Sequence, residues 1–212
     1  MPRPPEQPVR LVVLISGSGT TLENLAAKIR TGHLKAEIPL VIASRPDCGG
    51  IEKAQRIDVP CEVISRKSFA SAADFSAAIF ERCRGVKADL VICGGFLALL
   101  QIPADFRHRV LNIHPSLIPA FCGQGFHGSA VHAAVLRRGC KFSGCTIHFV
   151  DDEYDQGPII AQRVVPVEEG DTPESLAQRV FAAECEAYPE AIQQVASGCV
   201  LVNGSATRLI AD

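Results

Sequence analysis

The sequence has no apolar run of the ~18–20 residues that a membrane-spanning helix requires. Neither sign of charge prevails, because 21 lysines and arginines stand against 23 aspartates and glutamates. Such a balance lacks the electrostatic footprint of a protein that binds DNA, RNA or an anionic membrane. The first ten residues also lack the apolar core of a signal peptide. We therefore expect a cytoplasmic protein with a disordered lead-in over residues 1–9 and a single domain over residues 10–212.

No Cys-x-x-Cys motif occurs among the nine cysteines, and their number is odd. A disulfide framework or a zinc site is therefore not predicted. The histidines at positions 114, 127 and 132 are close in the sequence, but their spacing is not typical of metal ligands. We expect free, mostly buried thiols in a reducing compartment and no bound metal.

Short apolar runs alternate with helical patterns along the first part of the chain. This alternation predicts an α/β fold with a doubly wound, mostly parallel sheet. Two longer strands around an acidic turn predict an antiparallel hairpin in the C-terminal half. The expected strands are 10–16, 38–43, 61–64, 89–93, 110–114, 143–150, 159–165, 200–202 and 207–210, and the expected helices are 20–29, 50–56, 72–84, 129–138 and 172–197, the last with a kink at Pro189.

Residues 16–21 (SGSGTT) join the first expected strand to the first expected helix. Free backbone N–H groups and the helix dipole at such a junction favour a bound phosphate, and glycines let the anion approach the backbone. The segment is not a dinucleotide-binding fingerprint, because Leu22 replaces its third glycine and the second strand ends without an acidic residue. A plain tight turn between strand and helix is the alternative interpretation.

Asn112 and His114 share one face of an expected strand, because strand side chains alternate. Pro115 ends that strand, so both polar groups lie at its carboxyl end, where open α/β sheets bind their ligands. An amide donor beside an imidazole is suited to stabilising an oxyanion. A core histidine whose hydrogen bonds are satisfied within the protein is the alternative.

The acidic segment 151–158 (DDEYDQGP) separates the two strands of the expected hairpin. It is typical of a solvated hairpin turn. In the functional interpretation, one of its carboxylates folds back onto His114, raises the pKa of the imidazole and holds the ring in place.

These three segments, in this order and at these separations, resemble one family, the phosphoribosylglycinamide formyltransferases. The resemblance runs from about residue 10 to residue 195, and its most specific pieces are LVVLISGSGTTLENL, LNIHPSLIPAF and GCTIHFVDDEYDQGPIIAQ. It implies a Rossmann-like formyltransferase fold, with a phosphate-binding half over residues 10–100 and a folate-binding and catalytic half over residues 101–212. The implied activity is transfer of the formyl group of 10-formyltetrahydrofolate to the amine of 5-phosphoribosylglycinamide in purine (IMP) biosynthesis.

The resemblance also implies roles for individual residues. The catalytic residues would be Asn112, His114 and Asp155, with Asn112 and a protonated His114 stabilising the tetrahedral oxyanion and Asp155 setting the protonation of His114. The implied binding residues are Gly19, Thr20 and Thr21 for the substrate phosphate, Glu184 for the ribotide, and Leu97, Ala98, Leu99, Leu100 and Asn112 for the folate. The implied partners are these small molecules alone, with neither nucleic acid nor membrane, in a monomer or a homodimer.

The sequence departs from the family's pattern at several positions. Thr21 occupies a position where an asparagine is common. Ala72 and Ala98 occupy positions where arginines are common. We therefore expect other residues, such as Arg66 or Lys67, to bind the folate tail. Residues 97–100 are also compatible with a buried helical turn. The glycine-rich loop 122–128 differs from the commoner Pro-Gly-Leu-His form and is expected to be mobile or tightly wound over the site.

Other functions stay open. A related formyltransferase would use another amine, such as a sugar nucleotide, and a formyltetrahydrofolate hydrolase would use water. A methionyl-tRNA formyltransferase is disfavoured because the chain is not basic and no tRNA-binding domain is expected in it. A catalytically silent module that binds a nucleotide or a folate is the alternative from a different class.

Overall fold

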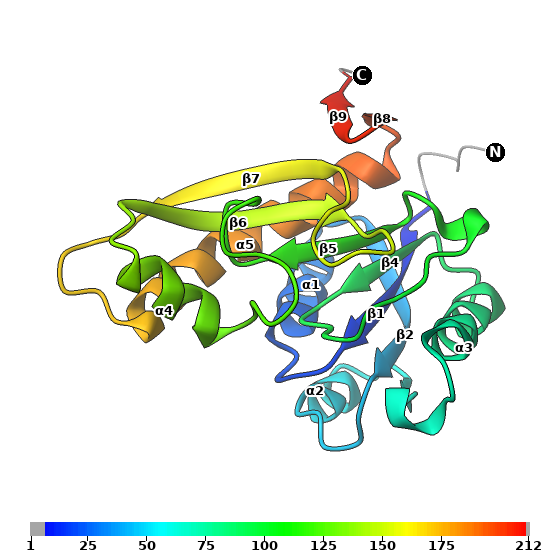
Figure 1. The fold of residues 1–212 in the computed structure, drawn as a ribbon. Helices are drawn as coiled ribbons and strands as arrows, with labels where there is room; N and C mark the ends of the chain where they lie inside the picture. Colours follow the sequence, from blue (N-terminus) through cyan, green and yellow to red (C-terminus); the bar gives the residue numbers. More distant parts are fainter. Residues whose placement is uncertain (1–6, 211–212) are drawn as a thin grey trace.

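The structure is a computed structural model that describes residues 7–210, so most of the expected lead-in lies outside the described residues. Its main sheet has seven strands in the order β3-β2-β1-β4-β5-β6-β7 (Figure 1). The pairs among the first five strands are parallel, and β6 and β7 are added antiparallel. The strands are β1 (Val9–Ile15), β2 (Ala36–Ala43), β3 (Cys61–Val63), β4 (Leu90–Cys93), β5 (Val110–His114), β6 (Phe142–Phe149) and β7 (Ile159–Pro166). The doubly wound, mostly parallel sheet with a C-terminal hairpin is therefore confirmed.

Helices cover both faces of the sheet (Figure 1). They are α1 (Thr20–Arg30), α2 (Gly50–Arg56), α3 (Ala72–Gly85), α4 (Ser129–Arg137) and α5 (Pro173–Ala196), with the short 3₁₀ helices η1 (Arg66–Ser68) and η2 (Ala104–Phe106), which the sequence patterns did not predict. Thr172 and Ser175 form a capping box at the start of α5. Pro189 lies inside α5, which continues past it to Ala196.

The apolar strand β1 shows how the layers are built. Leu11 and Val13 pack into one core with α1 and α5, while Val12 and Leu14 pack into a second core under α3. All four side chains are fully buried. A strand buried on both faces must be apolar without alternation, which is the pattern that the sequence shows over this segment.

The strand order reverses between β1 and β4, because the chain proceeds outward from β1 through β2 to β3 and then returns to pair β4 with the other edge of β1. At such a switch point the connections after the two strands run to opposite sides, and a crevice opens at the carboxyl ends. The SGSGTT segment follows β1, and the segment that begins with Gly94 follows β4.

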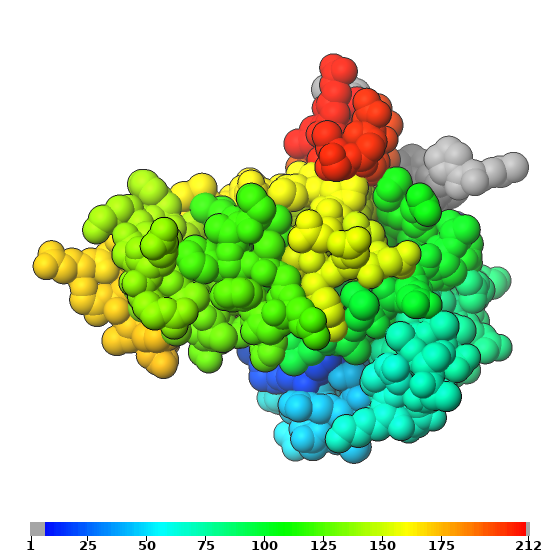
Figure 2. Space-filling view, viewed as in Figure 1, coloured from blue at the N-terminus to red at the C-terminus, as the bar shows by residue number. Residues whose placement is uncertain are grey.

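A second sheet consists of β8 (Val200–Asn203) and β9 (Ala206–Leu209), paired as an antiparallel hairpin. This hairpin stands out from the body of the molecule (Figure 2). The hydroxyl of Thr207 donates to the Ile159 carbonyl at 2.6 Å, which ties the hairpin to β7. Within residues 7–210, none of the helices combines the length and the apolar character that crossing a lipid bilayer requires.

Candidate active site

A cavity of about 640 Å³ opens at the carboxyl ends of the strands. This volume lies in the range typical of small-molecule sites. Seven of the predicted site residues line it: Thr20, Thr21, Leu97, Asn112, His114, Asp155 and Glu184. The structure thus brings together residues from α1, β5, α5 and two loops. Gly19, Ala98, Leu99 and Leu100 do not contribute to its wall.

Strand β5 presents Asn112 and His114 on one face, as the alternation predicts. Leu111 and Ile113 point to the other face and belong to the core under α1 and α5. His114 is 4% exposed and Asn112 is half-buried. The strand ends before Pro115, so both side chains reach the cavity at the carboxyl end.

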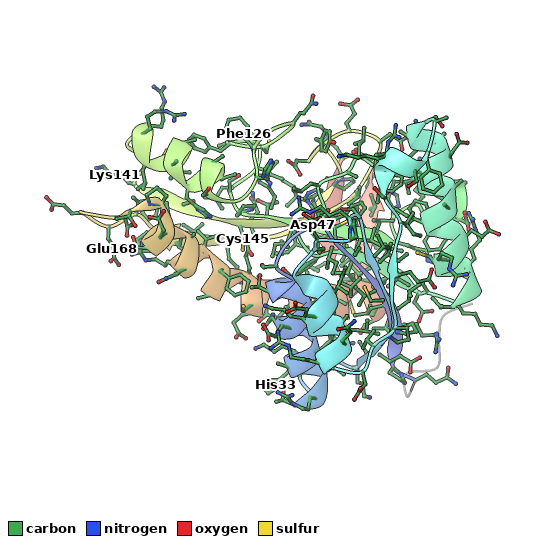
Figure 3. The ribbon with its side chains drawn as sticks, turned by 90° about the horizontal axis from the view of Figure 1, so that it is seen from below. His33, Asp47, Phe126, Lys141, Cys145 and Glu168 are labelled. Atoms are coloured by element: carbon green, nitrogen blue, oxygen red, sulfur yellow. The ribbon has the colours of Figure 1, made fainter. Side chains whose placement is uncertain are left out.

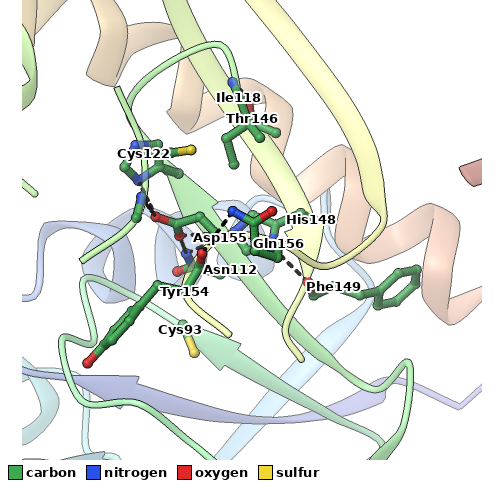
Figure 4. A network of polar contacts seen from close by, with 12 residues as sticks. Cys93, Asn112, Ile118, Cys122, Thr146, His148, Phe149, Tyr154, Asp155 and Gln156 are labelled. Atoms are coloured by element: carbon green, nitrogen blue, oxygen red, sulfur yellow. Dashed lines mark hydrogen bonds and ion pairs between the residues drawn. The ribbon is translucent and has the colours of Figure 1, made fainter. Parts of the chain in front are cut away.

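Asp155 is the carboxylate that folds back onto this pair, and Figure 4 shows it beside Asn112. Its Oδ2 accepts the backbone N–H of Gly123 at 2.9 Å and lies 3.5 Å from Nδ1 of His114. Its Oδ1 accepts from the amide of Asn112 at 3.4 Å. Burial alone would raise the pKa of Asp155, but the contact with His148, the Gly123 N–H and the charges of the neighbouring imidazoles hold that pKa below its ordinary value.

The His114 ring is oriented by a backbone carbonyl. Its Nε2 lies 2.8 Å from the Phe121 carbonyl oxygen, which can only accept, so Nε2 carries a proton and Nδ1 faces Asp155. Burial lowers the pKa of His114, and the charge of Asp155 offsets this effect only in part. Asp155 therefore raises the pKa of the imidazole, as expected, but burial lowers it by more, because the cost of desolvating the imidazolium outweighs the attraction.

A second histidine, His148, belongs to the site, although the sequence patterns did not single it out. It lies on β6 directly opposite Asn112, and its Nε2 is 3.1 Å from the Asn112 amide nitrogen. Its Nδ1 lies 2.7 Å from the Phe149 carbonyl oxygen and must donate to it. In the neutral ring Nε2 then accepts from Asn112, which holds the amide with its nitrogen towards Asp155. His148 could be found only from the register of the β5–β6 pair, and no local sequence pattern gives that register.

The SGSGTT segment reaches the cavity wall only at its end, where Thr20 and Thr21 begin α1. Gly19 has φ 74° and precedes the helix without a side-chain cap, so the first N–H groups of α1 lack a side-chain acceptor from this residue. A side chain at Gly19 would stand 2.6 Å from the Cα of Gly50, so only glycine fits the contact between this turn and α2. Thr20 is exposed and Thr21 is half-buried at the wall of the cavity.

Glu184 extends from α5 into the same cavity, where burial raises the pKa of its carboxyl to about 7. Helix α5 is anchored one turn later by Tyr188, whose hydroxyl lies 2.9 Å and 3.1 Å from the carbonyl oxygens of Leu111 and Cys93. These contacts tie the helix to β5 and β4 and so set the position of Glu184 relative to Asn112.

The segment after β4 reaches the cavity only in part. Leu97 lines it and is 47% exposed, whereas Leu100 is 2% exposed and packs into the core under α3. The backbone N–H of Leu97 donates to Ser16 at 3.1 Å. Residues 97–100 contain no helix, so the alternative of a buried helical turn is wrong. Arg66 and Lys67 lie on η1 and do not line the cavity.

The glycine-rich loop 122–128 has left-handed backbone at all three of its glycines. Gly123, Gly125 and Gly128 have φ values of 92°, 89° and 55°, which other residues adopt only with strain. The loop supplies the Gly123 N–H to Asp155 and carries Phe126 and His127, which also line the cavity. Figure 3 shows Phe126 on the opposite side of the molecule from His33.

Comparison with known proteins identifies the family. Residues 9–192 match the formyl transferase family. The chain belongs to this family. Within residues 7–210 of this formyl transferase, no cluster of three or more His, Cys, Asp or Glu side chains is placed to share a metal ion.

Individual relatives agree with the family. Glycinamide ribonucleotide transformylase 1 from Symbiobacterium toebii superposes with a TM-score of 0.89 at 40% identity, covering 96% of this chain and 95% of that one. The trifunctional purine biosynthetic protein adenosine-3 of Gallus gallus is 41% identical over 92% of this chain but only 19% of its own length. The chloroplastic phosphoribosylglycinamide formyltransferase of Vigna unguiculata is 36% identical over 87% of this chain and 60% of its own length. This formyl transferase chain thus spans less than two thirds of the last two proteins.

Proposed function

We propose that this chain transfers the formyl group of 10-formyltetrahydrofolate to the amine of 5-phosphoribosylglycinamide, a step of purine biosynthesis. The observation that carries the proposal is the convergence of Asp155 on Asn112 and His114 in a cavity that the start of α1 also lines. The cavity thus combines a centre suited to formyl transfer with a helix N-terminus suited to binding an anion. This combination fits a formyl donor and an amine acceptor that carries a phosphate. The names of the relatives support the same acceptor.

The acceptor phosphate would rest on Gly19, Thr20 and Thr21. Thr20 and Thr21 line the cavity at the start of α1, and the dipole of α1 adds attraction for an anion. Gly19 would act through its backbone, because it lies at the turn rather than in the wall. Glu184 would contact the middle of the ribotide, since α5 carries it into the same cavity.

The folate would enter beside Leu97, with its ring system against the segment from Leu97 to Leu100. Leu97 and Asn112 line the cavity, so they would contact the reacting end of the folate. Ala98 and Leu99 are half-buried and Leu100 is buried, so their contribution would come through the backbone or after movement of the segment.

Asn112, His114 and Asp155 would carry the chemistry as follows. The acceptor nitrogen attacks the formyl carbon, and the carbonyl π electrons move to oxygen to give a tetrahedral oxyanion. Asn112 has one N–H committed to His148, while the other makes only a 3.4 Å contact with Asp155 and is available to the oxyanion.

His114 would move the proton. Burial lowers its pKa, which favours the neutral ring, so Nδ1 would accept the proton that the attacking amine must lose. Asp155 stabilises the resulting imidazolium at a separation of 3.5 Å. The proton then passes to N10 of the folate as the bond between the formyl carbon and N10 breaks.

A spectrophotometric assay of folate turnover tests the proposed function. The purified chain is mixed with 10-formyltetrahydrofolate and either phosphoribosylglycinamide, the same compound without its phosphate, or no acceptor. We expect turnover with the ribotide and kcat/KM about 10–100-fold lower without the phosphate, the equivalent of its charge-assisted hydrogen bonds. Equal turnover without any acceptor would mean that the chain is a hydrolase, and folate binding without turnover would mean a silent module.

The cytoplasmic location, the choice between monomer and homodimer, and the division into halves at residue 100 stay predictions.

A further inference from the structure

His132 is a buried histidine that the mechanism above does not use. It lies on α4, is 4% exposed and lines the cavity. Its Nδ1 has no hydrogen-bond partner, and within residues 7–210 the only other buried side-chain N or O atom in this condition is Oγ of Ser143, which does not line the cavity. Because Nδ1 is closed off and unpaired, Nε2 is the polar atom of this cavity-lining ring that is left for a partner from outside the protein.

The position of its proton follows from the burial. Burial lowers the pKa of His132, and any positive charge on His114 would lower it further, so the neutral ring is favoured. A neutral imidazole carries one N–H and one lone pair. Burying an N–H without an acceptor is rarer in proteins than leaving an acceptor unpaired, so the lone pair belongs on the closed Nδ1 and the proton on Nε2. The ring therefore presents an N–H donor on the side that remains open.

The helix contacts assign this donor to one end of the cavity. Helix α5, which carries Glu184, packs against both α4, which carries His132, and α1, which begins with Thr20 and Thr21. These cavity-lining residues therefore come from three helices that are in contact through α5. Leu97 and Tyr154 come from the loops after β4 and β6 and are joined by a hydrogen bond at 3.5 Å. The donor of His132 is thus on the side proposed for the phosphorylated acceptor, and the Leu97 side is the one proposed for the folate.

We propose that His132 is a further substrate-contacting residue, whose Nε2–H donates a hydrogen bond to a carbonyl or hydroxyl oxygen of the phosphorylated amine acceptor. This proposal rests on the proposed function, because it requires an acceptor that bears such an oxygen between its phosphate and its amine. A neutral donor suits this role, since it orients an uncharged oxygen without competing with α1 for the phosphate.

Calorimetric binding of phosphoribosylglycinamide, without folate, tests the contact. His132→Phe keeps a planar ring but removes the donor, and we expect its Kd to rise about tenfold, the equivalent of one hydrogen bond. His132→Gln retains an N–H donor, and its Kd should stay within about threefold of the wild type. The Kd of 10-formyltetrahydrofolate should be unchanged in both variants. His33→Phe, at an exposed histidine outside the cavity, is the matched control.

The outcomes separate this inference from the function on which it rests. A wild-type chain that does not bind the ribotide overturns both. Ribotide binding by the wild type with an equal Kd in His132→Phe overturns the inference alone, as do equal losses in the Phe and Gln variants or a loss of folate binding in either.

Nitrogen NMR of the wild-type ring provides a test that requires no variant. We expect His132 to show the tautomer protonated at Nε2, with the Nε2 proton moving downfield when the ribotide is added and staying in place when folate is added. A ring protonated at Nδ1, or an Nε2 proton that does not respond to the ribotide, overturns the proposal even if the Phe variant fails to fold.

Discussion

His148 lies directly across the β5–β6 pair from Asn112, and its Nε2 is 3.1 Å from the side-chain nitrogen of Asn112. The same ring nitrogen is 3.5 Å from Asp155. Because Nδ1 of His148 is committed to the Phe149 carbonyl, the ring cannot turn without losing that bond. His148 therefore fixes which atoms of the Asn112 amide face Asp155 and which face an incoming substrate.

Replacing His148 by alanine should lower kcat without abolishing folding. The Asn112 amide would lose the acceptor that orients it, and the cost of an unpaired buried polar group is about 1–3 kcal/mol. We expect kcat to fall roughly 10–100-fold. The control is His33→Ala in the exposed turn after α1, which should retain full activity. Wild-type kcat in His148→Ala would show that the amide is oriented without the ring.

Replacing Asp155 by asparagine should shift the titration of His114 downwards. The pKa of His114 already lies below its ordinary value of 6.5 because of burial, and Asp155 is the main group that opposes the shift. Without that charge the imidazolium is harder to form, so the pKa falls further. Proton NMR of the His114 ring measures both values. We also expect kcat to fall by on the order of 10²–10⁴-fold. A higher His114 pKa in Asp155→Asn would contradict the proposed role of the carboxylate.

Glu184 should make the fold less stable as the pH rises. Burial raises the pKa of its carboxyl from 4.5 to about 7, so the folded chain binds this proton more tightly than the unfolded chain. The stability that it contributes is fully present below about pH 4.5 and is lost as the pH rises through about 7.

Glu184→Gln stays neutral and lacks this loss. Between about pH 5 and about pH 8, the wild type should therefore lose unfolding free energy relative to the variant. The expected loss is on the order of 2 kcal/mol after allowing for solvent screening. Denaturant unfolding at the two pH values measures the change. A difference that is independent of pH would show that the carboxyl titrates normally.

Gly157 should not tolerate a side chain. A Cβ at this position would overlap the carbonyl oxygen of Phe149, on the strand that carries His148. We expect Gly157→Ala to lower the free energy of unfolding by about 1–3 kcal/mol and to lower kcat as well, since the turn that carries Asp155 must shift. Gly85→Ala is the matched control, because nothing lies within 4 Å of a Cβ there. Equal thermal stability of the two variants would contradict the close approach.

The sequence predicts the elements well where the apolar pattern is strong. The bounds of α2 and β5 agree with the expectation at both ends, and β1 begins at Val9, one residue earlier than expected. Short apolar runs bounded by glycine or proline carry this information locally. The 3₁₀ helices η1 and η2 have only three residues each, too few to show a period.

The site is harder to predict from the sequence, because contacts between segments that are distant in the sequence determine its geometry. Asn112 and His114 can be placed from strand alternation alone. His148 depends on the β5–β6 register, and the Gly123 N–H depends on the path of a glycine-rich loop, so neither has a local signal. The net pKa of His114 is a balance between burial and Asp155 that only the three-dimensional arrangement determines.

The most direct measurement is turnover of 10-formyltetrahydrofolate with phosphoribosylglycinamide by the wild type, Asn112→Ala and His114→Ala, with the ribotide product identified by its gain of one formyl group. We expect formylated ribotide from the wild type and a loss of on the order of 10²–10⁴-fold in kcat in each variant, with all three proteins folded. Comparable turnover by His114→Ala, or release of free formate in place of formylated ribotide, would contradict this expectation.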